Sequence, residues 1–353
     1  MNDALQVIVG RNAARHLEKE GWRGRDVSLL LGASGGPKWL ILDHLDRLLF
    51  GSYLMEEREE PLQAIGSSVG TWRHACLAQD DPGAAIDRFE DIYINWDYSE
   101  KPDAQEISSV SAAMLDHVLG DRGARALVQH PQLHSYIVTA RGRGLNSSAS
   151  RLALGLAMGG AGLLNSLDRR LLSSQFQRVL FTSADAPPAP FRDFNAVSVP
   201  LQPEAVMPAL HASGSIPFVL AGERDLPGAP PGHYWDGGII DYHFALDTFK
   251  DAPLVLYPHF RGDITTGWFD KFLPWRRYRP AAADNLVLVS PGPAFIASLP
   301  RGKIPDRNDF LALEPDERKR YWRECVARSQ ELAEAFATLI QNPNPLAGVT
   351  VLD

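Results

Sequence analysis

The sequence is poor in cysteine. It has two cysteines in 353 residues, Cys76 and Cys325, which are far apart and lack the spacing of metal ligands. We therefore expect neither a disulfide framework nor a metal site, and a reducing cytoplasm fits this usage better than secretion.

An excess of positive charge is also missing. The chain has 43 acidic and 35 basic residues and a formal net charge of -8. Because nucleic-acid binders usually carry a basic excess, no nucleic-acid partner is expected.

Long apolar runs are absent too. The most hydrophobic stretch, residues 152–164 (LALGLAMGGAGLL), is shorter than the roughly 17–25 residues that cross a bilayer. Residues 1–10 show no basic start followed by a long apolar run. The pattern predicts neither a transmembrane helix nor a signal peptide, and so a cytoplasmic protein.

Short apolar segments that alternate with helical patterns make up most of the chain. Residues 27–31 and 62–65 have strand length, and each leads through a glycine-rich turn into a helical pattern. Further strands are expected at 135–140, 179–183, 196–199, 253–257 and 286–289, and further helices at 84–95, 109–119 and 205–213. This alternation predicts an α/β fold with a mostly buried sheet. One domain over residues 1–353 is the simplest interpretation, with a C-terminal helical cover of the sheet at about 308–341.

The first candidate for chemistry is Gly66-Ser67-Ser68-Val69-Gly70, which has the spacing G-x-S-x-G. It lies between an expected strand and an expected helix, the context of a nucleophile elbow. A serine in so sharp a turn needs small neighbours, here Gly66 and Gly70, and the helix N-terminus beside it favours negative charge. Ser68 is therefore the candidate nucleophile. The alternative is a glycine-serine turn that ends an edge strand.

A second candidate is the glycine-rich stretch of residues 32–38 (GASGGPK). A phosphate-binding P-loop needs G-x-x-x-x-G-K-[ST], but Pro37 stands at the second glycine and Trp39 at the Ser/Thr. The N–H groups of Gly35 and Gly36 remain suited to an oxyanion hole. A tight turn without a ligand is the alternative.

The third candidate is Asp236-Gly237-Gly238, which follows two aromatic residues. An aspartate before two glycines is often only a turn. Its occurrence after the G-x-S-x-G motif and the glycine-rich stretch makes a functional aspartate the better interpretation.

Together these elements resemble the patatin-like phospholipase family. The family pattern is a glycine-rich loop with a basic residue, then G-x-S-x-G, then A-S-x-x-x-P, then D-G-G. The chain has these elements in the same order at residues 35–38 (GGPK), 66–70 (GSSVG), 212–217 (ASGSIP) and 236–238 (DGG). The resemblance covers residues 27–247.

The resemblance implies a three-layer α/β/α fold with a mostly parallel central sheet and a Ser–Asp dyad. Ser68 would attack a carboxylic ester, of a lipid or phospholipid, while Asp236 accepts its proton, and water would hydrolyse the acyl-enzyme. No metal and no organic cofactor are implied.

Other positions of the site follow from the same resemblance. Gly35 and Gly36 would bind the oxyanion, Lys38 matches the family's basic position, and Gly237 and Gly238 complete D-G-G. Two departures concern this loop: Ser34 precedes only two glycines, and Trp39 follows Lys38 where a glycine is usual. Losing one oxyanion donor typically raises the barrier by about 2.7–4 kcal/mol.

A dyad makes a physical demand on its base. An ordinary aspartate has a pKa of about 3.9 and accepts a hydroxyl proton poorly. Asp236 must therefore be desolvated and fixed against Ser68, which the apolar neighbours Trp235, Ile239 and Ile240 promote.

Three alternative functions stay open. A Ser–Asp–His triad would use His243 or His259, which follow Asp236 in the chain order of α/β-hydrolases. An acyltransferase would pass the acyl group to an alcohol or a thiol instead of water. A non-catalytic lipid-binding protein on the same fold would explain the altered glycine loop.

Two segments bear on the substrate and on membrane contact. Residues 267–279 (GWFDKFLPWRRYR) interleave aromatic and basic side chains, which suits peripheral contact with a lipid headgroup layer. A loop that buries its aromatics is the alternative. Residues 152–164 suit either a flexible lid over an acyl pocket or a buried helix. The oligomeric state stays open.

Overall fold

The computed structural model describes residues 4–148, 150–191, 193, 196–276 and 283–352. A mixed sheet of 11 strands runs through this part of the chain. Its strands are β1 (Leu5–Val9), β2 (Leu29–Gly32), β3 (Leu62–Ser67), β4 (Leu133–Gly142), β5 (Phe176–Thr182), β6 (Ala196–Pro200), β7 (Glu223–Arg224), β8 (His233–Asp236), β9 (Val255–Pro258), β10 (Leu286–Pro291) and β11 (Thr350–Val351). The main order is β11-β1-β10-β9-β2-β3-β4-β5-β6, while β8 pairs with β4 and β7 pairs with β8.

The middle of the sheet is parallel. Strands β10, β9, β2, β3 and β4 run in the same direction. β2 (LLLG) and β9 (VLYP) are buried at every residue, as is typical of parallel strands covered on both faces. β1 and β5 are antiparallel to β10 and β4. The expected α/β fold with a mostly parallel sheet is confirmed, and the arrangement is consistent with three layers.

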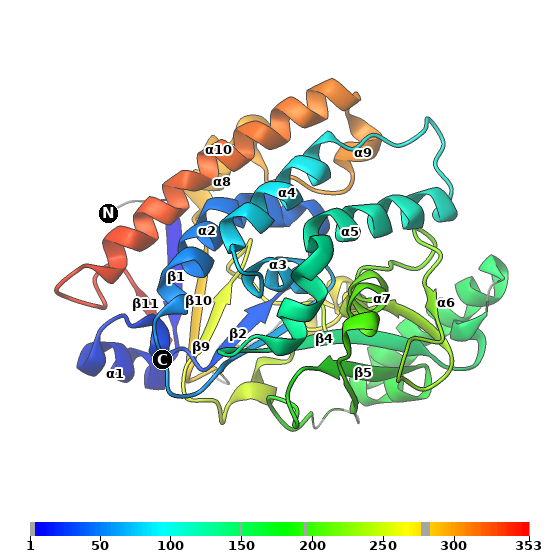
Figure 1. Cartoon of the computed structure of the whole chain (residues 1–353), viewed down its shortest axis with the longest axis horizontal. Helices are drawn as coiled ribbons and strands as arrows, with labels where there is room; N and C mark the ends of the chain where they lie inside the picture. The colour runs from blue at the N-terminus through cyan, green and yellow to red at the C-terminus, as the bar shows by residue number, and fades with distance from the viewer. Residues whose placement is uncertain (1–3, 149, 192, 194–195, 277–282, 353) are drawn as a thin grey trace.

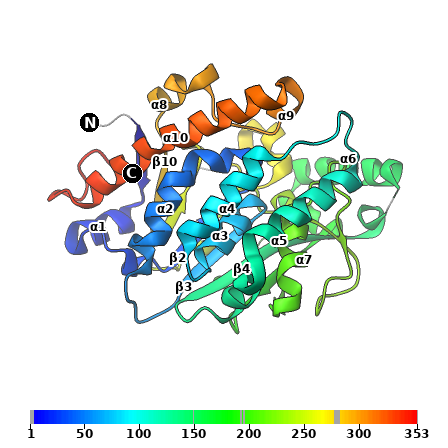
Figure 2. The same cartoon turned by 45° about the horizontal axis from the view of Figure 1, so that its top comes forward.

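Helices pack over the sheet and extend beyond it. The α-helices are α1 (Arg11–Glu20), α2 (Asp43–Gly51), α3 (Val69–Leu77), α4 (Pro82–Asn95), α5 (Ala104–Gln129), α6 (Arg151–Leu167), α7 (Pro203–Ser213), α8 (Pro293–Ser298), α9 (Asp309–Ala312) and α10 (Pro315–Ile340). Figures 1 and 2 show α2, α3, α4 and α5 together over one face of the sheet. Local sequence explains their starts: Asp81 caps α4 by accepting the N–H of Ala84, and Pro82 occupies the first turn.

Short 3-10 helices connect the larger elements. They are η1 (Gly24–Asp26), η2 (Gly36–Leu42), η3 (Tyr53–Met55), η4 (Gly144–Ser147), η5 (Arg169–Ser174), η6 (Gly237–Ile239), η7 (Leu246–Phe249), η8 (Trp268–Phe272), η9 (Pro274–Arg276) and η11 (Pro300–Gly302). The helical pattern expected after the first glycine-rich turn therefore starts as η2 and becomes α-helical only at α2.

The expected C-terminal cover is formed by α9 and α10. α10 packs mainly against α2 and η2, and the ring of Trp322 lies 6.0 Å from that of Tyr93 on α4, centroid to centroid. It therefore lies mainly over other helices and has a smaller contact with the sheet at β1.

The two segments expected at a substrate or membrane surface lie side by side. Residues 267–276 form η8 and η9, and η8 contacts α6; residues 277–279 lie outside the described residues. Phe269 is buried, whereas Phe272 and Trp275 are exposed. Among the described residues, no helix combines the length and the hydrophobicity needed to span a bilayer.

Two strands meet end to end along one side of β4. β3 runs parallel to the first part of β4 and ends with Ser67 opposite Val138. β8 runs antiparallel to the later part and ends with Asp236 opposite Thr139. Because Val138 and Thr139 are consecutive, the ends of β3 and β8 adjoin. This register brings Ser68 and Asp236 together although they are 168 positions apart.

Candidate active site

Ser68 occupies a sharp turn between β3 and α3. Its backbone has φ 55° and ψ -133°, a conformation that a non-glycine residue adopts only under constraint. The constraint is visible in three bonds: the Ser68 N–H donates to Ser213 Oγ (2.9 Å), and the N–H (2.9 Å) and hydroxyl (2.7 Å) of Thr71 donate to the Ser68 carbonyl. The turn therefore has the geometry of a nucleophile elbow.

The glycines of the elbow are required by close packing. A Cβ on Gly66 would lie 2.8 Å from the backbone of Gly70 and Thr71. A Cβ on Gly70 would lie 2.2 Å from the carbonyl oxygen of Gly32 on the neighbouring strand β2. Both glycines let α3 cross the strand ends closely enough to form the turn.

Asp236 is bonded directly to Ser68. The Ser68 hydroxyl donates to Asp236 Oδ2 at 2.9 Å, and the Gly238 N–H donates to Oδ1 at 2.7 Å. The Asp236 N–H donates to the carbonyl of Ser215 at 2.8 Å. Ser68 and Asp236 are each 6% exposed. The carboxylate is thus fixed at both oxygens and positioned to accept the hydroxyl proton.

Burial changes the basicity of this carboxylate. It raises the pKa of Asp236 to about 6, against the opposing effects of the bonds from Gly238 and Ser68 and of the positive charges of Lys271 and Arg307. An aspartate with this pKa is a better base toward a hydroxyl than an ordinary one and is still ionised at neutral pH. Asp236 is therefore desolvated, as the sequence analysis requires of a base in a dyad.

The two glycines after Asp236 pack closely between β4 and the glycine-rich loop. A Cβ on Gly237 would lie 2.3 Å from the Val138 carbonyl oxygen, and one on Gly238 would lie 2.5 Å from Ser34 Oγ. Gly237 and Gly238 form the start of η6. Their lack of side chains lets Asp236 approach both β4 and the glycine-rich loop.

The glycine-rich loop lies against the elbow. Ser34 Oγ donates to Ser67 Oγ at 3.0 Å, and the Ser34 N–H donates to the Tyr242 carbonyl at 2.9 Å. The N–H groups of Gly35 and Gly36 have no acceptor among the described residues. Two such free amides beside a nucleophile can stabilise a tetrahedral oxyanion.

The N–H of Val69, directly after Ser68, also has no acceptor in the described part of the chain. An amide at this position is the usual second source of an oxyanion hole in an elbow. The sequence reasoning named Gly35 and Gly36 and missed Val69, although its place in G-x-S-x-G could have indicated it.

The A-S-x-x-x-P segment, at the end of α7, links the two halves of the site. Besides accepting from Ser68, Ser213 donates its hydroxyl to the Val138 carbonyl at 2.7 Å. The Ser215 carbonyl accepts the Asp236 N–H, and the Ser215 hydroxyl donates to the His211 carbonyl at 2.8 Å. The motif therefore positions both Ser68 and Asp236, a role that its sequence pattern alone did not reveal.

Basic side chains act electrostatically on Asp236 or on one another. The Lys38 ammonium lies 5.5 Å from the centre of the Phe260 ring, and the Lys271 ammonium lies 3.5 Å from that of Tyr242. Lys38, Lys271 and Arg307 form no ion pair with any described residue. Desolvation and the neighbouring positive charges lower the pKa of Lys271 to about 7 and also lower the pKa of Lys38. Lys271 and Arg307 were not anticipated from the sequence.

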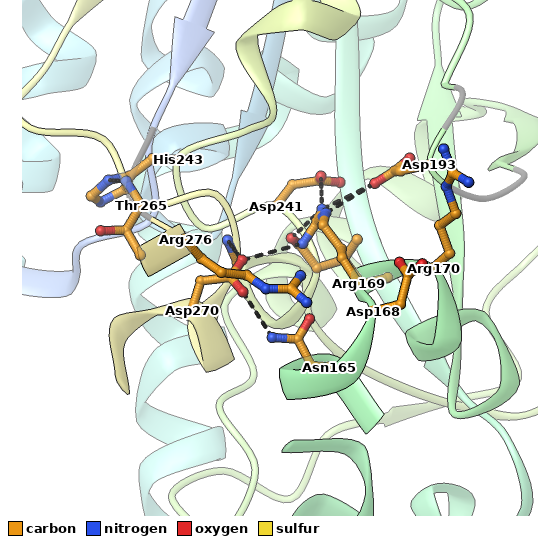
Figure 3. A network of polar contacts seen from close by, with 12 residues as sticks. Asn165, Asp168, Arg169, Arg170, Asp193, Asp241, His243, Thr265, Asp270 and Arg276 are labelled. Atoms are coloured by element: carbon orange, nitrogen blue, oxygen red, sulfur yellow. Dashed lines mark hydrogen bonds and ion pairs between the residues drawn. The ribbon is translucent and has the colours of Figure 1, made fainter. Parts of the chain in front are cut away.

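The histidines of the alternative triad lie outside the dyad's hydrogen bonds. His243 Nδ1 accepts the Thr265 N–H at 3.0 Å (Figure 3). His259 Nδ1 lies 2.7 Å from the Arg261 carbonyl oxygen and 3.1 Å from the Arg261 N–H. Burial lowers the pKa of His243 well below its ordinary value and that of His259 to about 3. Among the described residues, neither histidine forms a hydrogen bond with Ser68 or Asp236, whereas Ser68 bonds Asp236 directly.

Within the described residues, no group of three or more His, Cys, Asp or Glu side chains is arranged to hold a metal ion. Cys76 and Cys325 are both buried and free. Ser68 itself has polar contacts with Asp236, Ser213 and Thr71, as described above.

The fold and this constellation define a class of site: a serine in an elbow, a carboxylate bonded to it, and free amides alongside. Comparisons of the chain with protein-family models, with curated proteins and with solved structures gave no match. A function must therefore be inferred from the geometry of the site.

Proposed function

We propose that this chain is a serine acyl-hydrolase of the patatin-like kind that cleaves carboxylic esters, with lipid or phospholipid acyl esters as substrates. The observation that carries the proposal is the direct bond from the Ser68 hydroxyl to Asp236, 2.9 Å long and buried. Four short motifs dispersed over residues 35–238 meet around this bond, which supports the resemblance to patatin-like enzymes.

The reaction begins with transfer of the Ser68 hydroxyl proton to Asp236 Oδ2 while Oγ attacks the ester carbonyl. The N–H groups of Gly35, Gly36 and Val69 stabilise the resulting oxyanion. When the intermediate collapses, the C–O bond to the alcohol breaks and the alcohol leaves with the proton from Asp236. The acyl group stays on Ser68.

Water completes the cycle. Asp236 accepts a proton from the attacking water, the second tetrahedral intermediate collapses, and the proton returns to Ser68 as the acid leaves. An alcohol or a thiol in place of water would give an acyltransferase with the same dyad. The molecule that receives the acyl group is therefore the one that can reach the acyl-enzyme on Ser68.

Turnover of short p-nitrophenyl esters tests the dyad. Ser68→Ala should abolish hydrolysis, and Asp236→Asn should reduce kcat by about 10²–10⁴-fold because the base is lost. His243→Gln, which retains an acceptor for the Thr265 N–H, should keep most of the activity. Thermal unfolding of each variant checks that it is folded.

Labelling with a fluorophosphonate, which reacts with activated serines, separates an enzyme from a lipid-binding protein on this fold. The parent chain should be labelled at Ser68 and the Ser68→Ala variant should not. Absence of labelling in the folded parent chain, or turnover that survives in Ser68→Ala, would refute the proposal.

A further inference from the structure

One face of α6 is apolar and open to solvent. Four leucines on this face are between 66% and 76% exposed: Leu152, Leu156, Leu163 and Leu167. At about 100° per residue they fall within an arc of roughly 60°, and they span roughly 22 Å along the helix axis. The glycines among them, at positions 155, 159 and 160, are exposed as well, and α6 carries no charged side chain after Arg151.

The neighbouring segment η8–η9, which contacts α6 through η8, adds exposed aromatic side chains. Phe272 and Trp275 there are 70% and 71% exposed, and Arg276 donates to the Ser166 carbonyl of α6 at 3.5 Å. We call the six residues Leu152, Leu156, Leu163, Leu167, Phe272 and Trp275 the leucine surface. Six large apolar side chains exposed on two elements in contact mark an interaction site rather than ordinary protein surface.

The charges around the leucine surface are basic. Residues 141–178 contain six arginines and one acidic residue, Asp168, in a chain whose net charge is -8. Two of the six, Arg169 and Arg178, are ion-paired with Asp193 and Asp241. Arg151 and Arg170, next to the two ends of α6, are both exposed. A partner that combines apolar material with negative charge is complementary to this surface.

The opposite face of α6 packs next to the dyad. Leu154, Met158 and Ala161 belong to a small apolar cluster with Trp235, Ile239 and Ile240, the neighbours of Asp236 in sequence. This cluster is separate from the main core of the molecule.

Polar contacts reinforce this attachment. Asn165 of α6 donates to Asp270 of η8 at 2.7 Å, and Arg169 donates to the Ile240 carbonyl at 2.8 Å. Figure 3 shows Asn165 of α6, Asp270 of η8, Arg169 of η5 and Asp241 of the segment after Asp236 converging. The leucine surface is thereby held at a defined position beside the dyad.

We propose that the leucine surface docks this protein on an anionic lipid surface, with α6 lying in the plane of the interface. Helices of this kind bury an apolar stripe at the boundary of headgroups and acyl chains, while tryptophan and arginine favour the headgroup layer. The choice of a lipid partner rests on the proposed function, since a lipid ester must reach a dyad that lies next to α6. A second copy of this chain is the competing occupant and is one outcome of the test.

Co-sedimentation with vesicles tests the surface. The purified chain should sediment with vesicles of equal parts phosphatidylcholine and phosphatidylglycerol, and less with phosphatidylcholine alone. The double variant Leu156→Ser/Leu163→Ser should lower the partition coefficient by about tenfold for each leucine. Val351→Ser alters an exposed apolar residue on β11, at the opposite end of the sheet (Figure 1), and should bind like the parent.

Two further measurements separate this inference from the function. Ser68→Ala should sediment like the parent because docking needs no turnover, and the double leucine variant should keep its rate on a soluble ester because its folded site is intact. Equal sedimentation of parent and double variant, or no sedimentation of the parent with either vesicle, would overturn the proposal. A parent dimer that the double variant converts to a monomer would assign the surface to a second copy instead.

Discussion

At the scale of single residues, Asp236 combines two opposing influences. Burial favours its neutral form, while the bonds from Ser68 and Gly238 favour the carboxylate, and burial dominates. The result is a base whose pKa lies near 6 and therefore close to neutral pH. This is the range in which proton transfer from a serine hydroxyl is most effective at working pH.

The pH profile of kcat/KM for a neutral ester should reveal this value. Because the pKa of Asp236 is raised to about 6, the carboxylate becomes protonated as pH falls through 6 and can no longer accept the Ser68 proton. We expect kcat/KM to fall about tenfold for each pH unit below 6. Circular dichroism over the same pH range checks that the chain stays folded. A profile that stays flat down to the ordinary aspartate value would contradict Asp236 as the base.

Ser68 and Asp236 could be predicted because each lies in a short pattern with a definite local conformation. The contribution of Ser34 could not. In the sequence it is a departure from a glycine-rich loop, yet in the structure its hydroxyl bonds Ser67 and holds the loop against the elbow. Such a role depends on two loops meeting in space, which spacing along the chain does not encode.

At the scale of elements, the elbow depends on how α3 is held behind Ser68. Arg73 of α3 donates two bonds of 2.6 Å to Asp46 of α2, and both side chains are buried. This bidentate pair connects the helix that follows the nucleophile to the helical layer above the sheet. Removing one partner leaves the other charge buried without compensation.

Arg73→Met should therefore lower the free energy of unfolding by about 3–5 kcal/mol, measured by urea denaturation. The double variant Asp46→Leu/Arg73→Met removes both charges and should recover most of that loss, because no unpaired charge remains. Arg122→Met, which removes an exposed ion pair with Asp80, serves as a control and should change stability by less than about 1 kcal/mol. If the Arg73→Met variant were as stable as the parent, the ion pair would not anchor α3.

The elements that position Asp236 were harder to predict than those that position Ser68. β8 has four residues, too few for an alternating or apolar pattern to stand out. β4 is longer than the expected residues 135–140 and runs from Leu133 to Gly142, which gives β8 a place to pair beyond the end of β3. Short strands of this kind are stabilised by tertiary pairing, so local sequence indicates them poorly.

At the scale of the whole molecule, charge is distributed unevenly. The chain is acidic, with a net charge of -8. Positive charges nevertheless gather near the dyad. Those of Lys271 and Arg307 act electrostatically on Asp236, and those of Lys38 and Arg307 act on Lys271. Cations without ion-pair partners at a site raise the local concentration of anions there.

An ester that carries a carboxylate or phosphate close to the scissile carbonyl should consequently have a lower KM than a neutral ester with the same acyl chain. Lys271→Met should raise KM for the anionic ester about two- to fivefold, the magnitude of an exposed charge pair, and leave KM for the neutral ester unchanged. Lys250→Met alters an exposed lysine that precedes β9, at the amino edge of the parallel strands, and should change neither KM.

The ionisation of Lys271 gives this preference a pH dependence of known sign. Desolvation and the neighbouring cations lower its pKa to about 7, so its positive charge is lost as pH rises through 7. In the parent, the KM of the neutral ester divided by that of the anionic ester should therefore decrease above pH 7. Added salt should decrease this ratio at every pH because it screens the charges. The Lys271→Met variant should show a smaller ratio with less dependence on pH in this range. A ratio that is identical in parent and variant, at all pH values, would mean that Lys271 does not contact the charge of the substrate.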